Sequence, residues 1–322
     1  MASFFITGGC GFIGQWLTKR LVGEEHDVTV YDVKVDHSIM GDSPRIKTIK
    51  GGTDDTAALA QALKLSRPEV IVHYAALLSA TAEENPQAAY RVNIASAWPL
   101  WEAARLADVR SVLFASTAAV YGRARDKARE DRYRVPSTIY GISKVYGEMI
   151  GTWFSRTYGM DFAAFRYASV IGPGRGEGGA SAFTSLIIQK AAQGEPYAVQ
   201  VPARAQMPIV YVKDAVDATL FIARNIHAIH TEEKIFNVAG ISPGPSAGEL
   251  VRAVKRRLPE ARLEFQPDER IAKIVDSWST DLDSKRILAA GWRPSYSDLE
   301  VLIDDFIAEV RASKSSQRAR SS

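Results

Sequence analysis

Residues 7–14 read TGGCGFIG, a segment that holds four glycines among eight residues. An apolar run precedes it and an amphipathic run follows it, so the glycines lie where a strand passes into a helix. Gly8 permits a tight turn, Gly11 lets the backbone approach a pyrophosphate, and Gly14 lets the helix pack closely on the strand. Phosphates would then bind the free N–H groups at the positive end of the helix dipole. The segment therefore predicts a dinucleotide site.

An acidic residue follows this loop at the end of the next apolar run. Asp32 ends the run at 27–32 (DVTVYD), 18 residues after Gly14. A carboxylate at that position accepts hydrogen bonds from the adenosine ribose hydroxyls. Because it would repel a 2′-phosphate, we expect NAD rather than NADP as the cofactor.

Short apolar runs alternate with longer amphipathic segments through the first half of the chain. The runs at 3–7, 27–32, 69–76 and 111–117 have the composition of buried strands, and the segments between them have helical periodicity. This alternation predicts βαβ units, and hence an α/β fold with a Rossmann doubly wound parallel sheet.

The sequence changes character after residue 172. A glycine-rich loop at 172–183 (GPGRGEGGASAF) interrupts the alternation. We expect residues 1–165 to form an NAD-binding domain that also receives segments near 208–240, and residues 166–312 to form mainly a smaller, discontinuous substrate-binding part. The basic, serine-rich end at 313–322 is expected to be disordered.

Composition argues against several classes of function. With 40 basic and 37 acidic residues, the net charge of +3 gives no general attraction to nucleic acid or to an anionic membrane. No apolar run approaches the ~20 residues that span a bilayer, and no signal-peptide pattern is found. The single cysteine, Cys10, excludes an internal disulfide and fits the cytoplasm, which is the expected location. The five histidines have no metal-ligand spacing, so no metal is expected.

Two residues four positions apart indicate proton transfer. Tyr140 and Lys144 lie in YGISK at the start of a predicted helix, where positions i and i+4 share one face. A nearby ammonium group lowers the pKa of a phenol, and the same lysine is suited to bind the nicotinamide ribose. A hydroxyl for the substrate oxygen is supplied by Ser116 or Thr117, at the C-terminal end of the run at 111–117, where ligands bind in open parallel sheets.

Together these motifs resemble the extended short-chain dehydrogenase/reductases, also called the NAD-dependent epimerase/dehydratase superfamily. The matching segments span nearly the whole chain: TGGCGFIG (7–14), YD (31–32), HYAA (73–76), VN (92–93), STAAVYG (116–122), YGISK (140–144), FRYASVIGPG (165–174), YVKDA (211–215), FNVAG (236–240) and GWRP (291–294).

The resemblance implies further roles. It places Ala75 and Ala76 along the cofactor, Asn93 in support of the active-site helix, and the loop 167–170 near the nicotinamide. It also makes Thr117 the catalytic hydroxyl, with Ser116 as a neighbour. The expected cofactor contacts are Gly8, Gly11, Phe12, Ile13, Gly14, Asp32, Thr53, Asp54, Ala75, Ala76, Asn93, Tyr140, Lys144, Tyr167 and Val170.

Within this list, Thr53 replaces the family's usual adenine-contacting aspartate, and Asp54 beside it is a possible substitute. The family pairs the helix before the catalytic hydroxyl with the Tyr-x-x-x-Lys helix, which implies a homodimer. Pro99 lies inside the first of these helices and should kink it.

Departures from the family pattern narrow the activity. Ala118 and Ala119 replace the Asp–Glu pair of dehydratases, which disfavours a dehydratase because neither alanine carries a proton. Ser169 and Met207 replace the Asn and Arg with which nucleotide-sugar epimerases hold phosphates, although Arg204 is nearby.

Three later segments resemble threonine-dehydrogenase-like members, which act on small hydroxylated molecules. These segments are 207–220, 272–287, which includes DSW at 276–278, and 289–299.

The first hypothesis is an NAD-dependent oxidoreductase that oxidises a secondary alcohol of a small hydroxy acid, amino alcohol or sugar acid. Tyr140 acts as general base, Lys144 keeps it acidic, Thr117 donates to the substrate oxygen, and the hydride passes to NAD. The alternative is a sugar or nucleotide-sugar epimerase with a transient keto intermediate. A third reading is a non-catalytic NAD-responsive binding protein. The expected substrate contacts are Ser79, Ser116, Thr117, Tyr140, Ser181 and Trp278.

Overall fold

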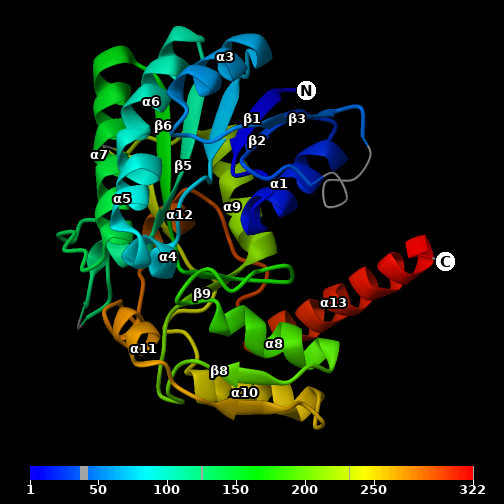
Figure 1. Ribbon diagram of the computed structural model, residues 1–322. Helices are drawn as coiled ribbons and strands as arrows, with labels where there is room; N and C mark the ends of the chain where they lie inside the picture. The colour runs from blue at the N-terminus through cyan, green and yellow to red at the C-terminus, as the bar shows by residue number, and fades with distance from the viewer. Residues whose placement is uncertain (37–42, 125, 232, 322) are drawn as a thin grey trace.

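The computed structural model describes residues 1–36, 43–124, 126–231 and 233–321 (Figure 1). Within these residues, no helix is both long enough and apolar enough to cross a membrane. No group of three or more His, Cys, Asp and Glu side chains in the same described residues is arranged to hold a metal ion.

Seven strands form the main sheet, in the order β10-β6-β5-β4-β1-β2-β3, and every neighbouring pair is parallel. The strands are β1 (Ser3–Thr7), β2 (Asp27–Asp32), β3 (Ile46–Lys50), β4 (Val70–His73), β5 (Ser111–Thr117), β6 (Asp161–Tyr167) and β10 (Ile235–Val238). The strand order reverses between β1 and β4, and ligands bind at the C-terminal strand ends at such a point. The predicted Rossmann α/β fold is confirmed.

Helices cover both faces of this sheet (Figure 1). On one face lie α3 (Thr56–Ser66), α6 (Ala97–Leu106) and α7 (Ile139–Tyr158); on the other lie α1 (Phe12–Gly23) and α9 (Val212–Asn225). The first face buries an aromatic core in which Trp101 lies edge-on to Phe114 and Phe162. Because both faces are covered, the strands are apolar along nearly their whole length.

A smaller part lies beyond the C-terminal strand ends, at the bottom of Figure 1. Its helices are α8 (Phe183–Gln193), α10 (Ala247–Arg257), α11 (Glu269–Asp276) and α13 (Leu299–Ser321), whereas α12 (Lys285–Ala289) packs against β10 of the main sheet. Its strands form two small parallel sheets, β7 (Ser169–Ile171) with β9 (Ile209–Tyr211) and β8 (Tyr197–Val199) with β11 (Leu263–Phe265).

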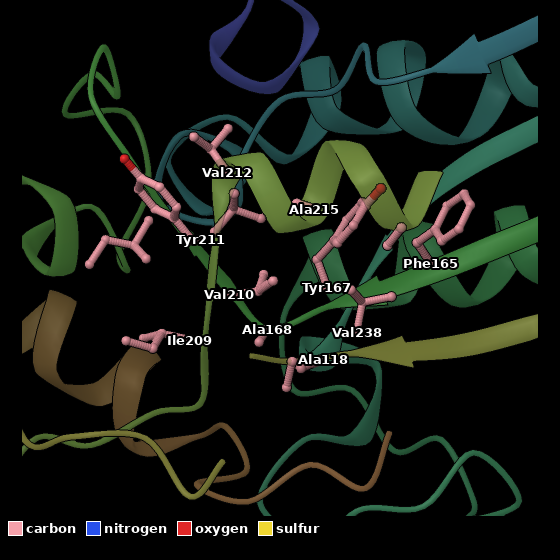
Figure 2. Packing of buried hydrophobic residues seen from close by; sticks show 14 of the residues in the cluster. Ala118, Phe165, Tyr167, Ala168, Ile209, Val210, Tyr211, Val212, Ala215 and Val238 are labelled. Atoms are coloured by element: carbon pink, nitrogen blue, oxygen red, sulfur yellow. The ribbon is translucent and has the colours of Figure 1, made fainter. Parts of the chain in front are cut away.

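The chain passes between the two parts more than once. After β9 it returns to cover the main sheet with α9, and β10 then pairs with β6 at the sheet edge. Figure 2 shows the result: Ile209 and Val210 of β9, Ala215 of α9 and Val238 of β10 belong to one buried cluster. One apolar core therefore extends from the sheet into the smaller part.

The segment 87–107 has helical periodicity and contains Pro99, but it does not form one continuous helix. The chain forms α4 (Ser79–Glu84), α5 (Pro86–Ala89), a π-helical segment (Tyr90–Ala95) and then α6. At the junction, Ser96 N donates to Arg91 O, five residues back, at 3.2 Å. Pro99 has no N–H to donate, so the regular helical pattern cannot continue unbroken through this region.

The structure also differs from the sequence expectation at the C-terminus. Residues 313–322 were expected to be disordered, whereas α13 continues through Ser321; residue 322 lies outside the described residues. The physical reason is continuity: the segment follows directly on a helix whose earlier turns are packed, and extending a helix costs less than starting one.

Candidate active site

A cavity of about 530 Å³ opens at the C-terminal ends of the main-sheet strands. Its walls come from the glycine-rich loop, the residues after β2 and β4, the end of β5, the first turns of α7 and the loop after β7. Every expected site residue except Asn93 lines it: Gly8, Gly11, Phe12, Ile13, Gly14, Asp32, Thr53, Asp54, Ala75, Ala76, Ser79, Ser116, Thr117, Tyr140, Lys144, Tyr167, Val170, Ser181 and Trp278.

The glycine-rich loop has no room for side chains. Gly8 has a φ of +69°, and a Cβ on it would lie 2.7 Å from the backbone nitrogen of Ala75. A Cβ on Gly14 would lie 2.7 Å from Gly9 Cα and closer still to the carbonyl oxygen of Gly8. No side chain caps α1 at Gly11, so its first N–H groups are left for a ligand. The loop thus has the form that a pyrophosphate requires.

The acidic residue that ends β2 lines the cavity and is fixed by backbone hydrogen bonds. Asp32 accepts hydrogen bonds from the backbone N–H of Cys10 and of Lys34, each at 3.0 Å. Nearby, the buried Thr53 hydroxyl donates to the carbonyl of Val92 at 3.4 Å, whereas Asp54 is exposed. Asp54 is therefore the freer of these two polar side chains for the adenine end of a dinucleotide.

Asn93 lies behind the cavity wall. Its amide accepts from Leu77 N at 2.8 Å and donates to Leu77 O at 2.9 Å, and it makes a weaker 3.4 Å contact with the Ser143 hydroxyl of α7. These bonds tie the loop after β4 to the active-site helix. Asn93 therefore connects the loop after β4 to α7 and does not line the cavity.

The Tyr–Lys pair lies on the first turns of α7, which is capped by Thr138. Lys144 is buried, and its ammonium nitrogen lies 4.8 Å from the ring centre of Phe114 and 5.6 Å from that of Tyr140. Burial raises the pKa of Tyr140 to about 12, while a hydrogen bond from Thr117 and the charge of Arg175 oppose that rise. Burial lowers the pKa of Lys144 to about 7, and the charge of Glu148 opposes that fall.

From the sequence, Lys144 is the group expected to lower the pKa of Tyr140. In the structure, burial acts on both groups in the direction of neutrality, so the phenolate needs additional support. Thr117 and Arg175 act in that direction, although the effect of burial on the pKa of Tyr140 is larger.

Arg175 is a charged cavity-lining residue that sequence reasoning missed. It follows Gly174, which has a φ of +86°, and its guanidinium turns into the cavity. There it donates to the Val170 carbonyl and to Ser181 Oγ at 2.6 Å, and lies 5.9 Å from the ring centre of Phe12. The available signal was an arginine alone among the glycines of GPGRGEGG, the loop that follows a cavity-lining strand.

Two of the expected substrate contacts have a hydrogen-bond donor that no described residue uses. Ser79 Oγ accepts from Ala180 N at 3.3 Å, which leaves its hydroxyl proton available. Trp278 has a buried indole N–H without a hydrogen-bond partner among the described residues. Ser116 differs, because its hydroxyl donates to the Glu148 carboxylate at 2.5 Å, away from any substrate.

Tyr167 contributes its ring to the cavity rather than its hydroxyl. The Tyr167 hydroxyl is hydrogen-bonded at 2.5 Å to Thr219 of α9, which also bonds the Tyr74 hydroxyl at 3.1 Å. Figure 2 shows the Tyr167 ring beside α9. Two walls of the cavity are thereby fixed to the helix behind them.

Comparison with known proteins agrees with this geometry. Residues 4–239 match the family model described as NAD dependent epimerase/dehydratase family. The chain is 31% identical to a probable UDP-glucuronate 4-epimerase of Rhizobium meliloti, over 71% of this chain and 70% of the relative. It is 28% identical to D-erythronate dehydrogenase of Cupriavidus necator, over 92% of this chain and 95% of the relative.

A solved structure shares the fold. The holo form of a GalE-like L-threonine dehydrogenase from Cupriavidus necator superposes with a TM-score of 0.86 at 26% identity, covering 96% of this chain and 99% of that one.

Proposed function

The chain belongs to the NAD-dependent epimerase/dehydratase family, and we propose that it oxidises a secondary alcohol of a small polar substrate that carries a carboxylate. The observation that carries this proposal is the Arg175 guanidinium inside the cavity. Ser79, Ser181 and Trp278 line the same cavity and supply hydrogen-bond donors. A planar cation among neutral donors matches a carboxylate group.

Acidic and basic side chains lie at opposite ends of the cavity, and this separation would orient both NAD and the substrate. Asp32 and Asp54 lie at the end where the adenosine of NAD would bind, and Lys144 and Arg175 lie at the opposite, catalytic end. The uncapped start of α1 and the side-chain-free glycine loop fit the pyrophosphate between them. When bound, NAD supplies the hydride acceptor.

The catalytic side chains then divide the proton chemistry. Tyr140 takes the proton of the substrate hydroxyl as general base. Thr117, at the end of β5, is hydrogen-bonded to Tyr140, and its single hydroxyl proton turns to the substrate oxygen when substrate binds. Lys144 stabilises the Tyr140 phenolate when the lysine is in its protonated, ammonium form. Arg175 supports the same phenolate and orients the substrate through its carboxylate.

The alternative activity is a sugar or nucleotide-sugar epimerase. The similarity to a probable UDP-glucuronate 4-epimerase supports it. The cavity wall argues against a nucleotide handle, because Met207 lines the cavity and the Arg204 side chain is 77% exposed and outside the lining. Ser169, at the family's Asn position, is hydrogen-bonded to Thr184 at 3.1 Å.

The test is a substrate panel assayed with NAD by the absorbance of NADH. The panel pairs hydroxy acids, hydroxy amino acids and sugar acids with the matching uncharged alcohols, and adds UDP-sugars. We expect net NADH only with the carboxylates. Arg175→Met should lower kcat/KM for them by roughly 100-fold, because it removes a charged hydrogen-bond donor.

The control is Arg262→Met, the same exchange at an exposed arginine that donates to the Gly194 carbonyl outside the cavity. It should leave kcat/KM unchanged. Conversion of a UDP-sugar without release of NADH would favour the epimerase, and full activity of Arg175→Met would refute the carboxylate proposal.

We also propose that the protein is a homodimer that pairs the α6 and α7 faces. The exposed side chains on these helices include Trp98 (45% exposed), Trp153 (42% exposed), Ile142 and Met149. The ring centres of the two tryptophans lie 5.4 Å apart. Large apolar side chains gathered on one surface are typical of an interface. Sedimentation should show a dimer that Met149→Glu dissociates; a monomeric parent would refute the pairing. The cytoplasm remains the expected location.

A further inference from the structure

A fully buried ion pair lies directly behind the catalytic side chains. Glu148 and Arg166 are both 0% exposed at the side chain, and they are joined by two hydrogen bonds, of 2.8 Å from Nε and 2.7 Å from the terminal nitrogen. Arg134, from the loop before α7, also donates to the Glu148 carboxylate, at 3.4 Å. A buried ion pair is weak evidence for a contribution to stability, because apolar residues of the same volume often serve as well. Its position relative to the active site gives it a second role.

Glu148 is part of the catalytic face of α7. Tyr140, Lys144 and Glu148 follow one another at intervals of four residues, so their side chains share one face of the helix. The same Glu148 carboxylate accepts from Ser116 Oγ at 2.5 Å. Because Ser116 immediately precedes Thr117 at the end of β5, this bond connects the strand that carries the catalytic hydroxyl to the helix that carries the catalytic base.

Arg166 extends the connection to two further strands. It lies on β6 next to Tyr167 and donates to the Tyr121 hydroxyl at 2.7 Å. That hydroxyl in turn donates to Asn237 Oδ1 of β10 at 2.7 Å. The ends of β5, β6 and β10 are thus held to α7 by one buried network.

Lys144 is surrounded by few charged or titratable groups. On its own helix it has Tyr140 and Glu148; from β4 it faces His73, whose ring stacks on Phe114. Burial lowers the pKa of His73 to about 3, so that ring is neutral in the working range. Among the described groups acting on Lys144, Glu148 is therefore the one that brings negative charge.

We propose that Glu148 is a positioning residue, which through Ser116 and Arg166 fixes Thr117 against Tyr140 and holds a negative charge one helical turn from Lys144. This inference rests on the proposed oxidation of an alcohol by the same site. Without the network, Thr117 would lose its fixed approach to the phenol, and Lys144 would lose the charge that favours its ammonium form. Both losses make the Tyr140 phenolate harder to form.

The experiment compares Ser116→Ala and Glu148→Gln with the parent, using NAD and a carboxylate substrate across a range of pH. Ser116→Ala should lower kcat roughly tenfold with unchanged affinity for NAD, because it loosens Thr117 and leaves the ion pair intact. Glu148→Gln should move the acid limb of the kcat/KM profile to higher pH by about one unit.

The matched control is Ser111→Ala at the start of the same strand. Ser111 is as buried as Ser116, but its hydroxyl has no partner in the described residues, so its loss should leave kcat and the pH profile unchanged. Circular dichroism of each variant reports whether it folds. If Glu148→Gln fails to fold, Ser116→Ala carries the test.

A readout without turnover separates this proposal from the proposed function. The ultraviolet absorbance of tyrosinate is titrated in each NAD-bound variant and in the same variant with Tyr140→Phe, and the difference reports the ionisation of Tyr140. We expect Tyr140 to ionise about one pH unit higher in Glu148→Gln. A parent without any NADH formation would overturn the proposed function alone. A Glu148→Gln variant with unchanged Tyr140 ionisation, or a Ser116→Ala variant with parental kcat, would overturn the positioning role.

Discussion

Gly14→Ala is the sharpest test of the cofactor site, because the structure determines what the new methyl group would meet. Its Cβ would lie 2.7 Å from Gly9 Cα and 2.8 Å from Gly9 O, and nearer still to the carbonyl oxygen of Gly8, whereas ordinary contact begins at 3.4 Å. All three atoms belong to the backbone of the glycine loop. The helix start or the loop must therefore move by at least about 0.7 Å to restore ordinary contact.

The size of the effect follows from that displacement. Overpacking of this kind costs roughly 1–3 kcal/mol, and here it falls on the N–H groups that would bind the pyrophosphate. At 1.4 kcal/mol per tenfold change, a loss of about 1–3 kcal/mol in binding raises the Kd for NAD roughly 5- to 140-fold. The assay is calorimetric titration with NAD, together with thermal unfolding of the unliganded variant.

Gly23→Ala is the control on the same helix. Gly23 ends α1, and a Cβ there would meet no atom within 4 Å. The exchange should leave the Kd for NAD unchanged and stabilise the protein by about 0.5 kcal/mol, since alanine has less backbone entropy to lose. Parental NAD affinity in folded Gly14→Ala would refute the placement of the pyrophosphate at this loop.

Three further substitutions test other parts of the site. Tyr140→Phe should lower kcat by roughly 1,000-fold with unchanged NAD affinity, measured by NADH absorbance and calorimetry, because it removes the base and keeps the ring; activity within tenfold of the parent would contradict this role. Asp32→Asn should narrow the preference for NAD over NADP by roughly tenfold or more in calorimetric titrations, since a carboxylate repels the 2′-phosphate; an unchanged preference would count against the ribose anchor. Lys144→Met should abolish activity yet stabilise the fold, most strongly at acid pH. The pKa of Lys144 is about 7 in the folded protein and 10.5 unfolded, so the unfolded chain binds more protons between these values and parental stability rises with pH across them. Removing the buried ammonium should therefore raise the free energy of unfolding by about 4–5 kcal/mol below about pH 7 and by little near about pH 10. Chemical denaturation measures this difference, and a stabilisation that does not depend on pH would contradict the prediction.

Local patterns explain why the cofactor half of the site was predictable. The strand–glycine–helix transition at 7–14 and the Tyr140–Lys144 spacing are each contained within one short segment, and their geometry follows from the period of a helix or a turn. The strand β3 was not anticipated, because its sequence IKTIK alternates polar and apolar residues as expected at a sheet edge, unlike the continuous apolar runs of the central strands.

The missed features depend on contacts between distant segments. Arg175 reaches the cavity only because the loop after β7 turns back over it. Ser116, Glu148 and Arg166 lie on three different elements, and their association requires the sheet to be assembled. The pKa shifts of Tyr140 and Lys144 could not be predicted for the same reason. Their i, i+4 spacing suggests mutual stabilisation, but burial, which dominates both shifts, is a property of the whole fold.

The returning path of the chain limits how such a protein can be recombined. Because α9 and the edge strand β10 come after the first elements of the smaller part, the two halves are not separable modules. A chimaera with a new substrate specificity would need one exchanged insert between β6 and α9 and a second one after β10. A single crossover point would pair β6 of one parent protein with β10 of the other. Substrate specificity in this architecture is therefore expected to diversify by loop replacement rather than by domain shuffling.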